Sequence, residues 1–357
     1  MNTLFRYFLR VYFGNFIRVM IGLSVITVLI DMIELTRRTS SITDFTIFDM
    51  AGLAALRAPS FLQNIVPFVV LFAAMMTLLT LNKRQELVIT RASGMSAWQF
   101  IAPLCAGSLI IGFITIGLFN PLAATGLRLS EDVQIQVGLK APAGSNVVPW
   151  FRQSTQEGAI IIGAEQASSA GTLLGSPSFY FFDKNNNPIM RVDAETASLR
   201  NGEWVLTKAS IYKDGKIEKT DRFSAPASID PLLLRQTLTP PETIAYLDLS
   251  KSIDSARAFG LPIWPYAMRW HSLTALPALL VAMTLIAATV SLRFARFGHS
   301  SAAVLGGIVA GFLLYVVTAM AEALGGAGII APVISAWMPV IAASFFGVTF
   351  LLHKEDG

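Results

Sequence analysis

Residues 82–94 read NKRQELVITRASG and form a charged island between two long apolar segments. Those segments, residues 61–81 and 100–122, are each long enough to cross the hydrocarbon core of a bilayer, which takes about 20 apolar residues. The island favours a helix over Gln85 to Ala92, and Gly94 can supply the left-handed residue that ends it. We therefore expect an ordered surface for another protein on one side of a membrane.

The composition of the chain agrees with a membrane protein. Of its 357 residues, 54% are hydrophobic and only 14% are charged, and the mean hydropathy is +0.58. Soluble domains carry about 25% charged residues. The net charge is +4, but the cations adjoin apolar segments, which fits control of membrane topology better than nucleic-acid binding. The single cysteine, Cys105, excludes a disulfide within the chain and a cysteine metal cluster.

Hydropathy predicts an α-helical integral membrane protein with six transmembrane helices. The expected spans are residues 13–33, 61–81, 100–122, 266–292, 301–324 and 329–352. The first apolar run is too long for a signal peptide, so we expect a retained helix. The predicted organisation is spans one to three with the charged helix at about 83–94 (residues 1–130), an inserted domain (131–250), and spans four to six (251–357).

Lysine and arginine in the short loops predict the orientation. They gather at the amino end, between spans two and three, and between spans four and five, all on one face if the spans alternate: Arg6, Arg10, Arg18, Lys83, Arg84, Arg91, Arg293 and Arg296. The positive-inside rule makes that face cytoplasmic, with both termini, and makes the inserted domain periplasmic. Arg37 and Arg38 fall on the outer face against this rule.

The insert shows the alternation of β-strands. Asn201-Gly202 and Asp214-Gly215 separate apolar-alternating runs, and these dipeptides are strong hairpin signals. Several short strands in about 110 residues predict a β sandwich or jelly roll. Residues 237–242 are expected to be the exit linker, followed by an amphipathic helix over 247–259.

Catalytic motifs are missing from the sequence. It contains no phosphate-binding P-loop and no His-Glu-x-x-His zinc motif, and its three histidines are scattered. We therefore expect a non-enzymatic chain without a cofactor or metal of its own, so that any ATP would be bound by a separate subunit.

Two interpretations of the charged island remain open. It is either a solvated loop or a helix that docks in the groove of a partner. The second interpretation is favoured because Leu87, Val88 and Ile89 would otherwise be left in water, and because Glu86 offers a charge-assisted contact. The candidate coupling residues are Arg84, Glu86, Leu87, Val88, Arg91 and Gly94.

A second group of charges lies at the outer end of span one. Asp31, Glu34, Arg37 and Arg38 have the spacing of one helix face, and Arg57 and Arg128 fall at matching heights. These charges are either interfacial ion pairs or a site for an anionic headgroup, since arginine binds phosphate bidentately. The candidate substrate-binding residues are Glu34, Arg37, Arg38, Arg57 and Arg128.

Together these features resemble the LptF/LptG permeases, membrane subunits of the lipopolysaccharide exporter of Gram-negative bacteria. The resemblance covers essentially the whole chain and rests most on Glu86-Leu87-Val88-x-x-x-Ala92-Ser93-Gly94 between spans two and three. Four further stretches look more like the LptG branch: Arg6-Tyr7, Asp31-x-x-Glu34-x-x-Arg37-Arg38, Gly202-x-Trp204-Val205-Leu206 and Ala336-Trp337-Met338-Pro339.

The resemblance implies an inner-membrane complex of one LptF-like permease, one LptG-like permease, an LptB ATPase dimer and LptC, which passes lipopolysaccharide to the periplasmic LptA bridge. It implies that Glu86 docks on LptB and that Arg37, Arg38 and Arg128 meet the phosphates of lipid A. Asp31 stands where some relatives carry a lysine.

The expected function is a permease subunit that extracts lipopolysaccharide, driven by a separate ATPase. The two groups of three spans are expected to move as rigid bodies. The alternative is a membrane scaffold that relays ATPase motion to periplasmic partners and moves no lipid.

Overall fold

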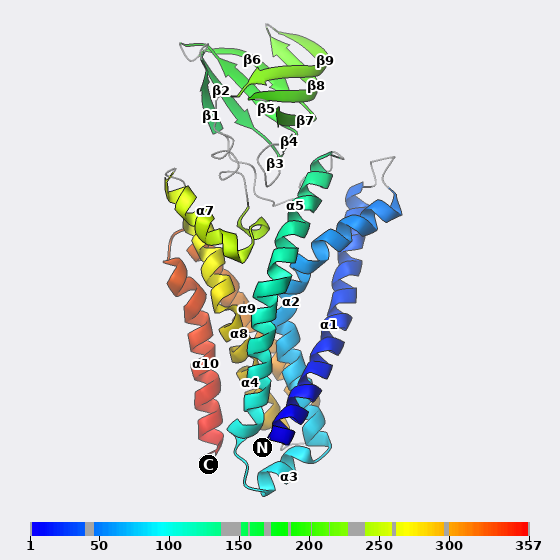
Figure 1. Cartoon of the computed structure of the whole chain (residues 1–357), viewed down its shortest axis with the longest axis vertical. Coiled ribbons are helices and arrows are strands. Elements are labelled where there is room, and N and C mark those ends of the chain that lie inside the picture. Colours follow the sequence, from blue (N-terminus) through cyan, green and yellow to red (C-terminus); the bar gives the residue numbers. More distant parts are fainter. Residues whose placement is uncertain are drawn as a thin grey trace.

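The computed structural model confirms an α-helical membrane protein with an inserted β domain. It describes residues 2–39, 46–136, 151–155, 158–167, 173–184, 187–200, 202–213, 215–227, 240–258, 262–295 and 300–355. Within these ranges six helical segments are long and apolar enough to cross a membrane. Both termini lie at one end of the helical bundle and the β domain lies at the other (Figure 1).

The helices follow the expected order. They are α1 (Asn2–Thr39), α2 (Ile47–Lys83), α3 (Glu86–Ala92), α4 (Ala97–Ile114), the π-helix η1 (Thr115–Phe119), α5 (Asn120–Gln136), the 3₁₀ turn η2 (Pro241–Thr243), α7 (Tyr246–Ala258), α8 (Trp264–Ala295), α9 (Ser300–Gly326) and α10 (Pro332–Glu355). The third span comprises α4, η1 and α5. The amphipathic helix expected over 247–259 is α7.

A π turn interrupts the third span, and proline explains it. Pro121 has no N–H to donate to the carbonyl of Gly117 four residues earlier, and its ring clashes with that carbonyl. The chain widens there, so that the N–H of Asn120 donates to the carbonyl of Thr115, five residues back. The extra residue changes which side chains of α5 face the bundle, because each residue turns a helix by about 100°.

The two halves of the bundle share one apolar core. Buried side chains of α2 and α4, such as Leu71 and Leu104, form one cluster with those of α8, such as Leu280 and Met283. The two groups of three spans are thus packed against each other, and their expected motion as rigid bodies stays a prediction.

Glycine brings α2 and α5 into backbone contact near the outer end. A Cβ added at Gly126 would lie 2.1 Å from the carbonyl oxygen of Leu56. The contact lies near a small cluster formed by Leu35 of α1 and Leu53 and Ala54 of α2. Together these contacts tie the outer ends of the first three spans together.

Alanine in place of Gly126 is expected to destabilise the bundle by about 1–3 kcal/mol, because the backbones of α2 and α5 must separate. Thermal unfolding of the detergent-solubilised protein measures the change. Gly52→Ala is the matched control, since a Cβ there meets nothing within 4 Å. Equal unfolding temperatures for the two variants would contradict the close α2–α5 contact.

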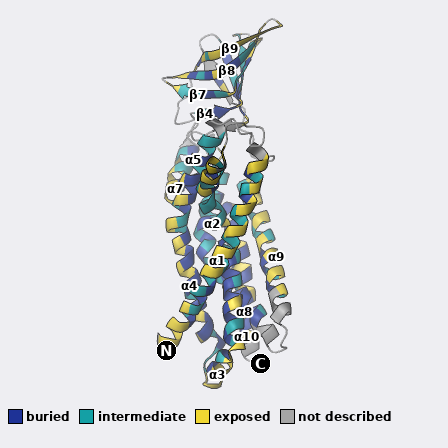
Figure 2. Ribbon diagram, turned by 90° about the vertical axis from the view of Figure 1, so that its right-hand side faces the viewer, coloured by how far each residue is buried: buried dark blue, intermediate teal, exposed yellow. Residues whose placement is uncertain are grey.

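Two spans are covered very little by the rest of the chain. Only 6% of the most apolar window of α1 and 11% of that of α9 is buried, against 67% for α8. Much of the α1 ribbon is coloured as exposed in Figure 2. The exposed apolar side chains include Ile30 and Ile33 on α1, and Phe312 and Leu313 on α9. These faces contact lipid or other chains.

In the described residues, nine strands form one curled antiparallel sheet in the order β1-β2-β5-β6-β8-β7-β4-β3, with β9 beside β8. Their bounds are β1 (Phe151–Thr155), β2 (Gly158–Gly163), β3 (Gln166–Ala167), β4 (Leu173–Gly175), β5 (Ser178–Phe182), β6 (Pro188–Asp193), β7 (Thr196–Arg200), β8 (Glu203–Lys213) and β9 (Lys216–Pro226). The predicted hairpins at 201–202 and 214–215 are confirmed by the pairing of β7 with β8 and of β8 with β9.

A bend in β8 curls the sheet. Lys208 has a positive φ of 50°, and one edge of β8 pairs with β6 beyond this residue and with β7 before it. The two arms enclose an apolar core in which Phe179 packs edge-on against Trp204. Lys208 also pairs with Glu195 at 2.6 Å, which raises the pKa of the Lys208 ammonium.

Candidate functional site

The predicted charged helix is present at the end of the bundle that holds both termini (Figure 1). Gln85 (φ 62°) turns the chain into α3, and Gly94 (φ 85°) turns it out. The N–H of Gly94 donates to the carbonyl of Arg91, and that of Met95 to the carbonyl of Thr90. The prediction that Gly94 ends this helix in a left-handed conformation is confirmed.

The helix buries one face and exposes another. Leu87 is only 3% exposed and belongs to the apolar core of the bundle, so the expectation that it would lie in water is wrong. Leu87 and Thr90 are three residues apart, and both face the bundle. Val88 and Ile89 are 52% and 67% exposed, and they form the apolar surface that α3 leaves uncovered.

Glu86 is held by a residue that the sequence did not suggest as its partner. Tyr7 of α1 donates a hydrogen bond to the Glu86 carboxylate at 3.1 Å, and Arg84 Nη1 lies 3.9 Å from the same oxygen. Tyr7 precedes Glu86 by 79 residues, so no local pattern could reveal the pair. Arg91 stacks its guanidinium over the ring of Phe100 at 5.5 Å. The α3 surface is thus attached directly to α1 and α4.

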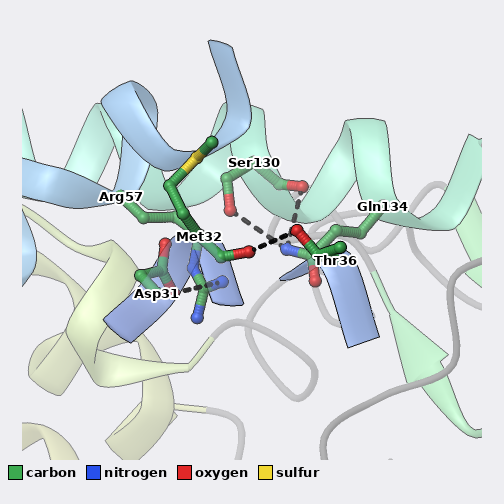
Figure 3. Close-up of polar contacts among 6 residues, drawn as sticks. All are labelled: Asp31, Met32, Thr36, Arg57, Ser130 and Gln134. Atoms are coloured by element: carbon green, nitrogen blue, oxygen red, sulfur yellow. Dashed lines mark hydrogen bonds and ion pairs between the residues drawn. The ribbon is translucent and has the colours of Figure 1, made fainter. Parts of the chain in front are cut away.

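Asp31 and Arg57 form a buried ion pair at the other end of the bundle. Arg57 Nη1 lies 2.9 Å from Asp31 Oδ1, with the side chains 17% and 6% exposed (Figure 3). The guanidinium also lies 5.2 Å from the centre of the Phe61 ring. On α5 beside the pair, Gln134 donates hydrogen bonds to Ser130. Arg57 is therefore engaged with the protein itself.

The charges of α1 do not share the single face that their spacing predicted. Asp31 faces α2, whereas Glu34 and Arg37 pair with each other at 3.0 Å on the surface, where the Arg37 side chain is 79% exposed. The side chain of Arg38 lies outside the described part of the structure. The surface pair contributes little to stability, so Arg37 can exchange partners at low cost.

Arg128 has a different environment from the other predicted arginines. Its Nε donates a hydrogen bond to the carbonyl oxygen of Thr243 in η2, the turn through which the chain returns from the β domain. Each arginine thus has its own partner: Arg37 pairs with Glu34, Arg57 with Asp31, and Arg128 with Thr243.

A buried polar layer joins α1 to the bundle between these two ends. Tyr12 and Ser108 share a hydrogen bond of 2.8 Å, and Ser108 and Thr284 one of 2.6 Å, which links α1, α4 and α8. Asn15 donates to Thr77 of α2 at 2.9 Å. Such bonds fasten α1 to the bundle where its apolar contacts are few. Hydropathy could not indicate them, because single polar residues barely change the mean of an apolar window.

Metal-ligand groups are missing from the described residues: no three histidine, cysteine, aspartate or glutamate side chains lie close enough to hold a metal ion.

Comparison with known proteins gives two matches. The family model "Lipopolysaccharide export system permease LptF/LptG" matches residues 6–353. The chain is also 25% identical over 334 residues to the lipopolysaccharide export system permease protein LptG of Haemophilus influenzae, and the alignment covers 88% of each chain.

Proposed function

Because this chain belongs to the LptF/LptG family of lipopolysaccharide export permeases, we propose that it is the LptG-like subunit of an ATP-driven exporter. In this role it takes lipopolysaccharide from the inner membrane and passes it toward a periplasmic bridge. The termini and α3 lie in the cytoplasm, and the β domain lies in the periplasm. The observation that carries the proposal is one bundle with a docking surface at one end and arginines at the other.

The docking surface receives force from an ATPase dimer. Val88 and Ile89 enter an apolar groove of the ATPase, and Glu86 makes a charge-assisted contact that competes with the Tyr7 hydroxyl. Because Leu87 and Arg91 are packed against the bundle, a push on α3 passes directly into the neighbouring spans.

The arginines at the periplasmic end bind the phosphates of the lipid. Arg37 and Arg38 at the end of α1 are the first contacts, since the surface pair of Arg37 with Glu34 is easily exchanged for a phosphate. Arg128 offers its terminal nitrogens while its Nε stays on Thr243. Arg57 joins only if the lipid competes with Asp31. The acyl chains lie against the exposed faces of α1 and α9, shared with an LptF-like permease and LptC.

Photocrosslinking in cells tests this function. A photoreactive residue in place of Arg37 is expected to crosslink to lipopolysaccharide, and the same residue in place of Lys219, exposed on β9, is the matched control. Depletion of the chain is expected to make lipopolysaccharide accumulate in the inner membrane. Normal export after depletion would overturn the proposal. A chain that co-purifies with the ATPase, gives no crosslink at Arg37 and is dispensable for lipid release would instead be a scaffold.

A further inference from the structure

Two segments connect the β domain with the bundle, and side chains of the outgoing segment hold the returning one. The chain leaves through α5 and returns through residues 240–246 (Figure 1). Arg128 Nε donates to the carbonyl of Thr243, and the N–H of Tyr246 donates to Asn120 Oδ1 at 2.7 Å. Asn120 and Thr243 are each 1% exposed, so both bonds involve buried groups. We call Asn120, Arg128, Thr243 and Tyr246 the clasp.

The clasp is anchored on both sides. Asn120 donates its amide to Gln63 of α2 at 3.3 Å. The ring of Tyr246 stacks on Trp270 of α8, with 6.2 Å between centroids and 5° between planes, and its hydroxyl shares a hydrogen bond of 3.1 Å with Thr274. The returning segment is therefore fixed in the bundle at Tyr246, the first residue of α7.

The π turn explains why Asn120 has this position. Asn120 is the first residue after η1, and the extra residue of that turn rotates the following helix by about 100° relative to an uninterrupted α-helix. An unbroken helix would direct the Asn120 amide away from Gln63 and Tyr246. The irregularity caused by Pro121 is thus part of the clasp, and π turns often occur at functional positions.

We propose that Asn120 and Arg128 are positioning residues that make the β domain follow α5. Any displacement of α5 in the membrane pulls residues 240–246 by the same amount, so both connections move together and the β domain keeps one orientation over the bundle. Without the clasp, residues 240–246 would no longer follow α5, and the described contacts between the β domain and α5 would be those of β3 and β4. The inference rests on the proposed function in one respect, which is that the movement serves the transport of lipopolysaccharide.

Spin-label distances in the full transporter complex, in nanodiscs of phosphatidylethanolamine and phosphatidylglycerol, test the clasp. One label replaces the exposed Lys219 of β9, the other replaces the exposed Phe113 at the end of α4, and Cys105 is changed to serine. Asn120→Leu and Arg128→Met together remove both bonds. The distance distribution is expected to become at least about twofold wider, since the returning segment then no longer follows α5 and the β domain keeps only the contacts of β3 and β4 with that helix.

Conservative variants separate positioning from folding. Asn120→Asp keeps an acceptor for the Tyr246 N–H, and Arg128→Lys keeps a donor for Thr243 and the positive charge, so both are expected to retain the narrow distribution. If Asn120→Leu does not insert in the membrane, the width of the distance distribution in Arg128→Met is compared with that in Arg128→Lys. A wider distribution in Arg128→Met alone then supports the clasp. Unchanged distributions in Asn120→Leu, Arg128→Met or their combination would overturn the clasp.

Lipid release provides a second measurement. Asn120→Leu alone, which leaves Arg128 free to bind lipid phosphates, is expected to lower lipopolysaccharide released per ATP severalfold while the ATPase rate stays within about twofold of the parent, an uncoupling that general destabilisation does not produce. The distances between the spin labels can be measured in the absence of lipopolysaccharide. A wild-type complex that releases no lipopolysaccharide, with distributions that widen as expected, would therefore refute the proposed function and leave the clasp intact.

Discussion

Replacing Glu86 with arginine is expected to abolish export while the protein still inserts in the membrane. The substitution removes the carboxylate offered to the ATPase and sets a cation beside Arg84 on the α3 surface. A basic group where an acceptor is required leaves the partner's donors unpaired, which typically costs 2–5 kcal/mol at an interface, or roughly a 30- to 5,000-fold loss of affinity. Co-purification of the ATPase and lipopolysaccharide in the inner membrane are the measurements.

Two control variants test whether the effect depends on the position and on the charge of Glu86. Glu218→Arg makes the same charge change on exposed β9 and is expected to leave ATPase binding unchanged. Glu86→Gln keeps an acceptor for Tyr7 and is expected to retain part of the binding. ATPase co-purification and export at wild-type levels in Glu86→Arg would contradict the role of α3 as the docking helix.

Replacing Arg57 with methionine is expected to destabilise the protein by about 3–5 kcal/mol, because Asp31, which is 6% exposed, loses its ion-pair partner. Methionine preserves much of the side-chain volume, so loss of packing is minimised. Thermal unfolding of the detergent-solubilised chain measures the effect, and we expect α1 to become accessible to proteolysis first, since its other contacts are few.

The double variant Asp31→Asn with Arg57→Gln isolates the charge. It replaces the ion pair by two amides that can bond to each other, and we expect it to regain most of the stability lost in Arg57→Met. If Arg57→Met unfolds at the wild-type temperature, Asp31 and Arg57 do not form the buried pair. A stable double variant that no longer binds lipopolysaccharide would assign Arg57 a direct part in binding the lipid.

Much of the architecture could be predicted from the sequence because its causes are local. The spans follow from runs of apolar residues, α3 from the composition of residues 85–92, and the hairpins from Asn201-Gly202 and Asp214-Gly215. The π turn lies just before Pro121, but proline alone does not predict such a turn, since Pro59, Pro67, Pro103, Pro277 and Pro339 lie within described helices that have none.

The candidate residues were found by charge, but their partners were not. Glu86 meets Tyr7 across 79 residues, and Arg128 meets Thr243 across 115. Spacing on α1 placed Asp31 with Glu34, whereas packing against α2 turned Asp31 inward to Arg57. Leu87 was expected to be exposed because nothing in its neighbourhood indicates that the bundle covers it.

The sequence by itself determined that the chain crosses a membrane, where the β domain is inserted, and that one charged helix separates two spans. These properties depend on the transfer of each segment from water to lipid and on turn chemistry, which act over a few residues. Only the tertiary structure decided which charges are neutralised, which face of α3 remains open, and how the β domain is fastened to α5. Those outcomes depend on distances between side chains of different helices, and helix packing alone sets them.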